Sequence, residues 1–354
     1  MSAAATQTAP APRALTMSAA INEALREEMR RDPRVIVIGQ DVGRFGGAFR
    51  VTRGLLEEFG EERVRDTPIS EAAIIGCAVG AAMLGWRLVA EMQYSDFVAC
   101  GFDQLVNEAA KIRLMSGGKA CVPMVLRVPI GASAHGAQHD QCPEAWFMHT
   151  PGLKVAIPSS AYDAKGLLKT AIRDDNPVVF CEHKGLYGAT SVGGRGLKET
   201  AVSDAGASGI IPLEEYTIPF GVADVKRVGT DVTIVATALM VRRALEAATQ
   251  LEGQGISVEV VDPRTLVPLD KATILASVHK TNRALVVTEE ARTASCGAEI
   301  AAMIAEEGFD DLDAPVGRLG ALDAPLPFAS ATQQALLPSV GDIAAAIRGL
   351  LLHD

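Results

Sequence analysis

One carboxylate, that of Glu71, stands where a helix is expected to begin. The segment DTPISEAAIIGCAVG (66–80) predicts a helix over 71–85, with Ser70 as its N-cap. A carboxylate in the first turn of a helix is often favoured by the helix dipole alone. In a partly apolar pocket, which the neighbouring alanine and isoleucine residues can supply, it becomes a candidate for acid–base chemistry. The residues themselves leave both interpretations open.

Two glycines, Gly76 and Gly80, lie one turn apart on the same predicted helix. Each costs about 1 kcal/mol relative to alanine in a helix interior. We therefore expect a close backbone approach on this stripe, for example by a symmetry-related or partner helix.

Three other candidate motifs are wrongly spaced or incomplete. Glycines over 39–46 follow G-x-x-x-G-x-x-G, whereas a dinucleotide site needs G-x-G-x-x-G. Ser116 and Lys119 match the S-x-x-K of serine acylases, but the accompanying S-D-N element is missing. The segment GASAH (131–135) lacks the final glycine of a nucleophile elbow. These motifs therefore predict neither a nucleotide site nor a serine nucleophile.

Composition narrows the class of protein. The chain of 354 residues has 33 Lys and Arg against 43 Asp and Glu, a net charge of −10. Without a basic stripe, we expect binding neither to nucleic acid nor to an anionic membrane. The longest apolar run, 72–86, is shorter than the roughly 20 residues of a membrane span. Six cysteines without a C-x-x-C pair predict free thiols in a reducing compartment, and the first fifteen residues resemble no secretory signal, so we expect a cytoplasmic protein.

Helices alternate with short, continuous apolar strands, which predicts an α/β protein with parallel sheets. Further helices are expected over 103–115, 161–173 and 296–307, among others. Residues 189–212 are rich in Gly, Ser and Ala and predict a long loop. We therefore expect four regions: a disordered tail (1–15), a first domain (16–188), a linker or insertion (189–225) and a second domain (226–354).

Sequence blocks along the chain carry a family resemblance. They include DTPISEAAIIG (66–76), EMQYSDF (91–97), QHDQ (138–141), EHKGLYG (182–188) and KTNRALVVTEE (280–290). The chain resembles the beta subunit of the thiamine-diphosphate-dependent dehydrogenase component of 2-oxo acid dehydrogenase complexes. The resemblance implies a transketolase-like fold, with a pyrimidine-binding domain followed by a transketolase C-terminal domain. It also implies a heterotetramer of two alpha and two beta subunits, attached to a lipoyl acyltransferase core.

The resemblance also implies roles for individual residues. Glu71 would hydrogen-bond N1′ of the aminopyrimidine and so help thiamine diphosphate lose its C2 proton, after which the cofactor acts as an electron sink during decarboxylation. Phe97 would pack on the pyrimidine ring, with Gln93 as a polar neighbour. His139, on a loop at the mouth of the site, would supply a proton during acyl transfer to lipoamide.

Two ions belong to the same family pattern. The resemblance implies that the alpha subunit binds Mg²⁺ and the diphosphate through a GDG motif, and this sequence contains no GDG. It implies a structural potassium ion, held largely by backbone oxygens, at four residues. These are Met124, Ala171, Asp174 and Asn176.

Departures from the family pattern leave the substrate open among pyruvate, acetoin and branched-chain 2-oxo acids. Asp140 replaces the more usual serine of Q-H-S-Q, and its carboxylate is expected to raise the pKa of His139. The loop 131–137 is one residue shorter than is common, and 189–212 resembles an insertion. Two alternatives remain: the C-terminal half of a split transketolase, and a non-catalytic scaffold. Retention of Glu71, Phe97 and His139 together argues against the scaffold.

Overall fold

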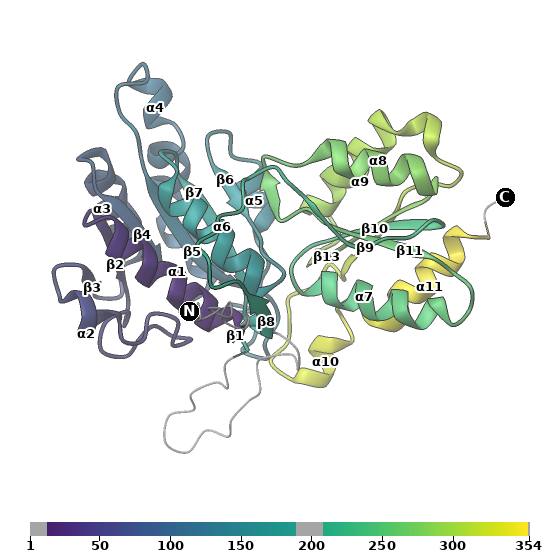
Figure 1. Ribbon diagram of the computed structural model, residues 1–354, viewed down its shortest axis with the longest axis horizontal. Coiled ribbons are helices and arrows are strands. Elements are labelled where there is room, and N and C mark those ends of the chain that lie inside the picture. The colour runs from purple at the N-terminus through teal and green to yellow at the C-terminus, as the bar shows by residue number, and fades with distance from the viewer. Residues whose placement is uncertain (1–12, 189–207, 353–354) are drawn as a thin grey trace, which may run out of the picture.

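The computed structural model describes residues 13–188 and 208–352, which form two α/β domains. Figure 1 shows them side by side, the first running from purple to teal and the second from green to yellow. The predicted alternation of helices with apolar strands is therefore confirmed in both halves of the chain.

The first domain is built on a seven-stranded sheet with the order β12-β6-β7-β5-β4-β2-β3. The six strands from the first half of the chain run parallel to one another. They are β2 (Val35–Gly39), β3 (Val64–Asp66), β4 (Arg87–Glu91), β5 (Met124–Ile130), β6 (Lys154–Ala156) and β7 (Val178–His183). Every residue of β5 and β7 is buried, which explains why these strands are mostly apolar in the sequence, with Arg127 and Glu182 as charged exceptions.

Helices cover both faces of this sheet. On one face, α1 (Met17–Arg31) packs against α6 (Ala161–Arg173); on the other, α3 (Glu71–Met83) packs against β4. Successive residues of β4 divide between the two cores: Val89 belongs to the core that includes α1 and α6, and Leu88 to the core that includes α3. The period of two along a strand thus places two helix layers on one sheet.

The second domain has a five-stranded sheet with the order β14-β13-β10-β11-β9. Its strands are β9 (Asp224–Arg227), β10 (Val232–Ala236), β11 (Val258–Asp262), β13 (Ala284–Ala291) and β14 (Gly317–Ala321). Only β9 of these runs antiparallel to its neighbour. Four longer helices flank the sheet: α7 (Leu239–Glu252), α8 (Lys271–Thr281), α9 (Cys296–Glu307) and α11 (Val340–Leu350).

One strand of the second half joins the first sheet. β12 (Thr265–Val267) follows β11 directly in the chain, yet it pairs antiparallel with β6 at the edge of the seven-stranded sheet.

Short helical segments complete the described chain. They are α2 (Leu55–Phe59), α4 (Ile112–Met115), α5 (Glu144–Met148), α10 (Ser330–Gln334), η1 (Ser95–Gly101), η2 (Gln104–Ala109), η3 (Lys184–Leu186) and η4 (Phe309–Asp311).

Two expectations about local structure are wrong. The helix expected over 103–115 is interrupted, because η2 is a π-helix and only α4 resumes the α-helical form. Leu114 and Met115 in α4 are 85% and 62% exposed, so this end of the stretch packs on no core. The strand β1 (Arg13–Thr16) pairs with β8 (Ser208–Ile211), which corrects the ends of the expected tail and loop. The rest of that tail (1–12) and loop (189–207) lies outside the described residues.

The glycine stripe of α3 is only partly explained by the chain itself. A Cβ on Gly76 would lie 3.3 Å from Cγ of Gln104 in η2, so here the close neighbour belongs to the same chain. Around Gly80, nothing in the described part of the chain lies within 4 Å of such a Cβ. Nearby, the side chain of Leu84 is 82% exposed. A partner helix on this stripe stays a prediction.

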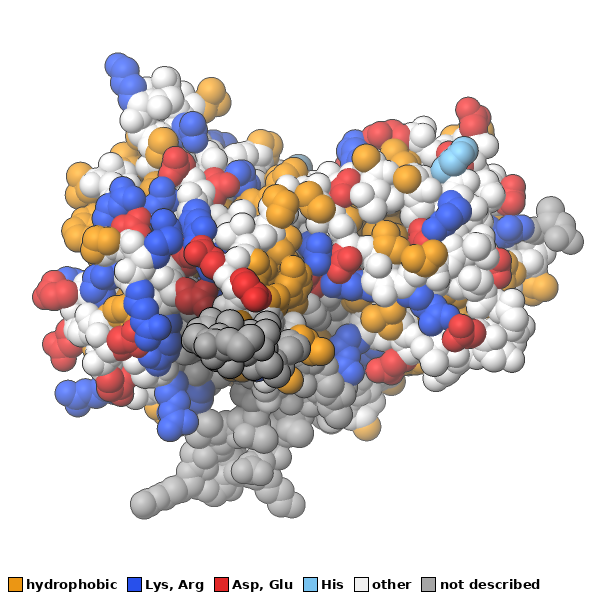
Figure 2. Space-filling view, in the orientation of Figure 1, with side chains coloured by type: hydrophobic (Ala, Val, Ile, Leu, Met, Phe, Trp, Pro, Cys, Tyr) orange, Lys and Arg blue, Asp and Glu red, His pale blue; other side chains and the backbone are white. Residues whose placement is uncertain are grey.

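Charged side chains of both signs are mixed over the face of the first domain that Figure 2 shows. Along α1, Arg30 pairs with Glu58 at 2.6 Å, and Glu27 pairs with Lys165 of α6 at 2.7 Å. Arg30 and Lys165 are thus engaged in ion pairs within the chain. Among the described residues, no helix is both long and apolar enough to cross a membrane.

Candidate functional site

Polar residues converge at one edge of the seven-stranded sheet, where its parallel strands end. Chain segments leaving β2, β3, β4, β5 and β7 all begin at this edge, because the carboxyl ends of parallel strands meet there. Ligands bind at this position in open parallel sheets. The residues concerned are Gln40 after β2, Glu71 after β3, Gln93 and Tyr94 after β4, His139 after β5 and Lys184 after β7.

Glu71 is the first residue of α3 and is half-buried. Its carboxylate accepts a hydrogen bond from Nε2 of Gln40 at 3.3 Å. Ser70 occupies the N-cap position as expected, although its side chain makes no capping hydrogen bond. The η1 segment packs directly on this turn, since a Cβ on Gly101 would lie 3.0 Å from the carbonyl oxygen of Glu71. η1 also carries Phe97, so Glu71 and Phe97, two of the three predicted cofactor residues, lie on neighbouring elements.

Three aromatic rings, those of Tyr94, Phe97 and His139, form a cluster beside α3. The His139 ring is perpendicular to that of Tyr94, with centroids 4.6 Å apart, and nearly perpendicular to that of Phe97, at 5.4 Å. Tyr94 and Phe97 themselves are 5.8 Å apart, edge to face. The structure thus brings His139 and Phe97 together. Gln93 precedes this cluster and is half-buried.

The loop that carries His139 is fixed through its backbone. The His139 N–H donates to the carbonyl of Gly136 at 3.0 Å, and Nζ of Lys184 donates to the carbonyl of His139. At the base of the loop, the Gly131 N–H donates to the carbonyl of Gln141 at 3.2 Å. The Gln141 side chain in turn donates to Asp96 of η1 at 2.8 Å. Backbone and side-chain bonds therefore hold both ends of the loop.

Asp140 organises the interior of this loop. Its fully buried carboxylate accepts hydrogen bonds from Ser133 Oγ at 2.6 Å and from the N–H groups of Ser133, His135 and Gly136 at 2.8–3.0 Å. Lys184 Nζ lies 3.4 Å from the same carboxylate. Burial opposes the charge, but the Ser133 hydrogen bonds and the Lys184 charge outweigh it and lower the pKa of Asp140. The expected effect of Asp140 on His139 stays a prediction, since this carboxylate is occupied by the loop amides.

Lys184 links this loop to the aromatic cluster. It is fully buried, and its ammonium lies 5.0 Å from the centroid of the Tyr94 ring. Burial lowers the pKa of Lys184, although Asp140 and Asp96 oppose the shift. Burial and the charge of Asp140 raise the pKa of Tyr94. One cation thus holds a ring, a carboxylate and the His139 carbonyl in fixed relation.

A buried ion network lies in the strands that carry the site. Arg127 of β5 pairs with Glu182 of β7 through two hydrogen bonds of 2.7 Å, and also with Glu91 of β4. The hydroxyl of Tyr187 donates to Glu182 at 2.8 Å. Burial alone would lower the pKa of Arg127, but the two carboxylates outweigh it and raise that pKa. This network joins three adjacent strands whose carboxyl ends hold the site.

The four residues expected to hold potassium lie at the other end of the strands, where β5 and β7 begin. Met124 begins β5, while Ala171, Asp174 and Asn176 belong to the end of α6 and the turn before β7. Cationic side chains already serve this turn. Arg87 donates to the carbonyl of Asp174 at 3.0 Å, and Lys154 pairs with its carboxylate. Potassium here stays a prediction, and such an ion would act on the fold rather than on the reaction.

The sequence did not single out four residues that build this site. Tyr94 lies between Gln93 and Phe97 in a block already quoted, so an aromatic at that place was a usable signal. Lys184 is a charged residue that directly follows the buried strand β7. Glu289 and Gln333 come from the second domain, and no local pattern distinguishes them. Their contacts, described below, are visible only in the fold.

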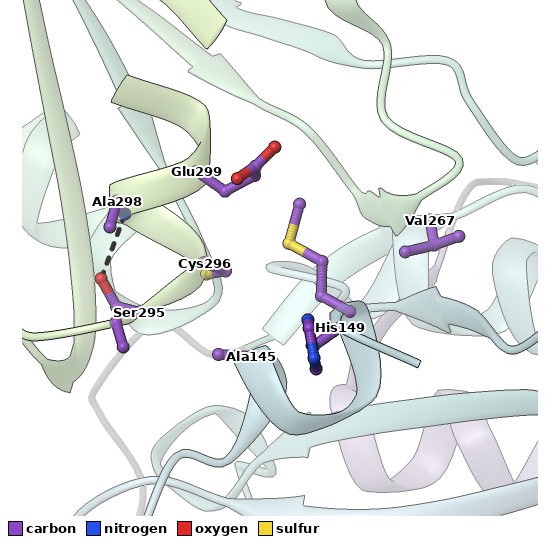
Figure 3. A pocket seen from close by; sticks show the side chains of 9 residues that line it. Ala145, His149, Val267, Ser295, Cys296, Ala298 and Glu299 are labelled. Atoms are coloured by element: carbon purple, nitrogen blue, oxygen red, sulfur yellow. Dashed lines mark hydrogen bonds between the residues drawn. The ribbon is translucent and has the colours of Figure 1, made fainter. Parts of the chain in front are cut away.

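Two adjoining pockets lie where the domains meet. The first, of about 580 Å³, is bounded by α5, β12 and the start of α9, and Figure 3 shows His149 on one side of it and Cys296 and Glu299 on the other. It contains none of the predicted site residues. The second, of about 800 Å³, shares Ser295 with the first. It reaches Gln141 at the base of the loop 131–141 that carries His139, called the histidine loop below. Groups of three or more His, Cys, Asp or Glu side chains able to hold a metal ion are absent from residues 13–188 and 208–352.

Comparisons with known proteins agree with the fold of the two domains. Residues 13–190 match the model of the transketolase pyrimidine-binding domain, and residues 221–343 that of the transketolase C-terminal domain. A solved structure described as a split-gene transketolase in an inactive beta4 tetramer has a TM-score of 0.74 over 96% of this chain and 99% of that one. At 22% identity, this likeness shows the fold alone.

Curated relatives are far more similar in sequence. The 2-oxoisovalerate dehydrogenase subunit beta of Bacillus subtilis (strain 168) is 47% identical, over 94% of this chain and 97% of the relative. The acetoin:2,6-dichlorophenolindophenol oxidoreductase subunit beta of the same organism is 43% identical, over 96% and 98%. The pyruvate dehydrogenase E1 component subunit beta of Rickettsia felis is 45% identical, over 96% and 99%. These identities support the dehydrogenase interpretation over a split transketolase, and the chain belongs to the family of E1 beta subunits of 2-oxo acid dehydrogenases.

Proposed function

We propose that this chain, together with an alpha subunit, forms the thiamine diphosphate site of a 2-oxo acid dehydrogenase. The observation that carries the proposal is the convergence of Glu71, Phe97 and His139 at one edge of the sheet. A carboxylate at a helix start, a ring on the adjoining segment and a loop imidazole against that ring supply the three functions that the family resemblance assigns.

The residues present fit the pyrimidine half of this cofactor. Glu71 offers a carboxylate to a ring nitrogen from a half-buried position at the start of α3. Phe97 offers an aromatic surface beside it. When bound, thiamine diphosphate supplies a carbanion equivalent and an electron sink for decarboxylation. In this proposal, Glu71 holds and moves the proton at the pyrimidine nitrogen, while the alpha subunit contributes Mg²⁺ and the diphosphate contacts.

His139 acts at the second stage of the proposed reaction. The half-buried imidazole lies on a loop whose base borders the pocket between the domains. From this position it would donate a proton as the acyl group passes to the lipoyl group of the acyltransferase core. The acceptor disulfide of that lipoyl group makes the overall complex an oxidoreductase.

The substrate is one of three classes. The curated relatives at 43–47% identity are named for 2-oxoisovalerate, acetoin and pyruvate, so identity does not separate them. We include in the proposal a cytoplasmic location, which the six free cysteines support. A potassium ion at the turn after α6 is included on the resemblance alone.

The proposal is tested first by purification and then by one substitution. We expect the native chain to elute with an alpha subunit of similar size that carries a GDG motif, and with a lipoyl acyltransferase, identified by mass spectrometry. A lone homodimer that binds thiamine diphosphate would contradict the division of the site between two subunits.

Glu71→Gln should leave assembly intact. It should reduce the rate of the reaction, either decarboxylation of pyruvate or 3-methyl-2-oxobutanoate or cleavage of acetoin, by orders of magnitude. Glu62→Gln is the matched control, because its side chain is 91% exposed and pairs only with neighbouring Arg65 among the contacts described. Near-normal turnover in Glu71→Gln, with the complex assembled, would remove the role assigned to this carboxylate.

A further inference from the structure

Gln333, in α10 of the second domain, reaches into the histidine loop of the first. Its side chain is 1% exposed, and all its hydrogen-bonding groups are engaged. Oε1 accepts from the N–H of Ala134 at 2.9 Å, while Nε2 donates to Asp140 Oδ2 at 2.8 Å and to the carbonyl of Pro327 at 3.2 Å. One amide therefore ties two points of the loop to the second domain.

The chemistry of these contacts requires an amide at position 333. Ala134 presents a donor and Asp140 presents a carboxylate, so the group between them must accept on one side and donate on the other. A carboxylate would satisfy Ala134 but would stand against the buried negative charge of Asp140. An apolar side chain would leave both loop groups without this partner inside the protein.

A second residue of the same domain holds the start of the loop. Glu289 of β13 accepts from the N–H of Ala132 at 2.6 Å and from Nε2 of His183 at 3.0 Å. Gly131 must pack directly on that imidazole, since a Cβ there would lie 2.2 Å from His183 Nε2. The loop is thus bound at its start by Glu289 and along its length by Gln333, both from outside the domain to which it belongs.

These ties converge on His139. Asp140 is the next residue, and its carboxylate fixes the N–H groups of His135 and Gly136, whose carbonyl in turn receives the His139 N–H. Displacing the Asp140 carboxylate therefore shifts the backbone from which the imidazole projects. A misplacement of about 1 Å in such a group costs on the order of a hundredfold in rate.

We propose that Gln333 is a positioning residue that sets the place of His139 through Asp140, so that the second domain controls acyl transfer to the lipoyl group. This inference rests on the proposed function and deepens it. Gln333 touches no reacting atom; it acts on the step that uses His139 and leaves the decarboxylation at Glu71 untouched.

The test compares two rates in the complex assembled with its alpha subunit. Decarboxylation is followed by reduction of 2,6-dichlorophenolindophenol, which does not involve a lipoyl group. Acyl transfer is followed with a free lipoyl domain as acceptor. The substrate is pyruvate, 3-methyl-2-oxobutanoate or acetoin, whichever the wild type turns over. The variants are Gln333→Glu, which adds the opposing charge, and Gln333→Met, which removes the amide at similar volume.

We expect both variants to lower kcat for lipoyl acylation by about tenfold or more, with KM for the lipoyl domain and the dye-linked rate within twofold of wild type. Gln334→Glu, one residue further on an exposed position, is the matched control and should change neither rate. Asp140→Ser removes the partner carboxylate, so Asp140→Ser combined with Gln333→Met should be no slower than the slower single variant.

A parallel loss of both rates, as from misfolding, or a loss of neither would overturn the inference. Additive losses in the double variant would overturn it as well. His139→Ala separates this outcome from failure of the proposed function: if His139→Ala slows acylation and the Gln333 variants do not, only the positioning role is lost. If His139→Ala leaves acylation unchanged, the role proposed for His139 fails, and the positioning role falls with it.

Discussion

The imidazole of His139 stands edge-on to the ring of Tyr94, with centroids 4.6 Å apart and planes at 87°. Phe97 meets the same imidazole from another direction, at 5.4 Å and 80°. Edge-to-face pairs of this kind are each worth about 0.5–1.5 kcal/mol beyond the area they bury. The rings therefore restrict the imidazole, while Lys184 and Asp140 restrict its backbone.

Tyr94→Leu should slow acyl transfer to the lipoyl group, because the imidazole loses one of its two packing surfaces. The roughly 0.5–1.5 kcal/mol of one edge-to-face pair corresponds to a rate lower by about two- to tenfold. Tyr94→Phe keeps the ring and should retain most of the rate. Single-turnover acylation of a lipoyl domain measures the difference, and equal loss in both variants would mean that the hydroxyl, not the ring, is what matters.

Arg127→Met should destabilise the first domain by about 3–5 kcal/mol, because it leaves Glu91 and Glu182 buried without their cation. Both carboxylates are 5% exposed or less in their side chains. Urea unfolding of the chain measures this loss. Adding Glu91→Gln to Arg127→Met removes one uncompensated charge and should recover part of the stability; a cost below about 1 kcal/mol in Arg127→Met would show that the network is not needed for folding.

A carboxylate at the end of β11 should give the free energy of unfolding of the chain a distinct pH dependence. Burial and the nearby charge of Asp163 raise the pKa of Asp262 from 3.8 to about 6, although Lys226 opposes them. Because the pKa is raised in the folded state, protonated Asp262 contributes its full stabilisation of the fold below about pH 4. That contribution is lost as the pH rises through about 6.

Asp262→Asn cannot ionise and should escape that loss. Relative to wild type, its free energy of unfolding should increase by about 2–3 kcal/mol between pH 4.5 and pH 7.5. Urea unfolding at the two pH values measures this difference. Asp313→Asn, an exposed carboxylate of the same domain, controls for the removal of one charge. A difference that does not change with pH would contradict the assigned shift.

Local signals in the sequence were sufficient wherever a capped amphipathic helix stands alone. α6 and α9 span 161–173 and 296–307 as expected, and Ser160 and Ser295 accept the capping hydrogen bonds from the third helical residues. The stretch 103–115 has the same kind of periodicity, but a π-helical turn shifts its phase, and periodicity carries no signal for that shift.

Contacts between the domains were not accessible in this way. Asp140 and Gln333 are 193 positions apart, and neither residue type nor spacing connects them. The family resemblance supplied Glu71, Phe97 and His139 but not the residues that hold them. From the sequence, Gln333 cannot be distinguished from a glutamine on the surface. Only the fold shows that it is buried.

The pairing of β12 with β6 adds three residues of the second half as an edge strand to the sheet of the first half. A hinge between the domains would have to break that ladder, so we expect the two halves to melt together as one cooperative unit. Cutting the chain between the domains would strip the edge of one sheet and leave the departing fragment with an unpaired strand, a template for aggregation. The same three residues thus restrict rigid-body motion between the domains, and they make the folding and the degradation of each half depend on the other.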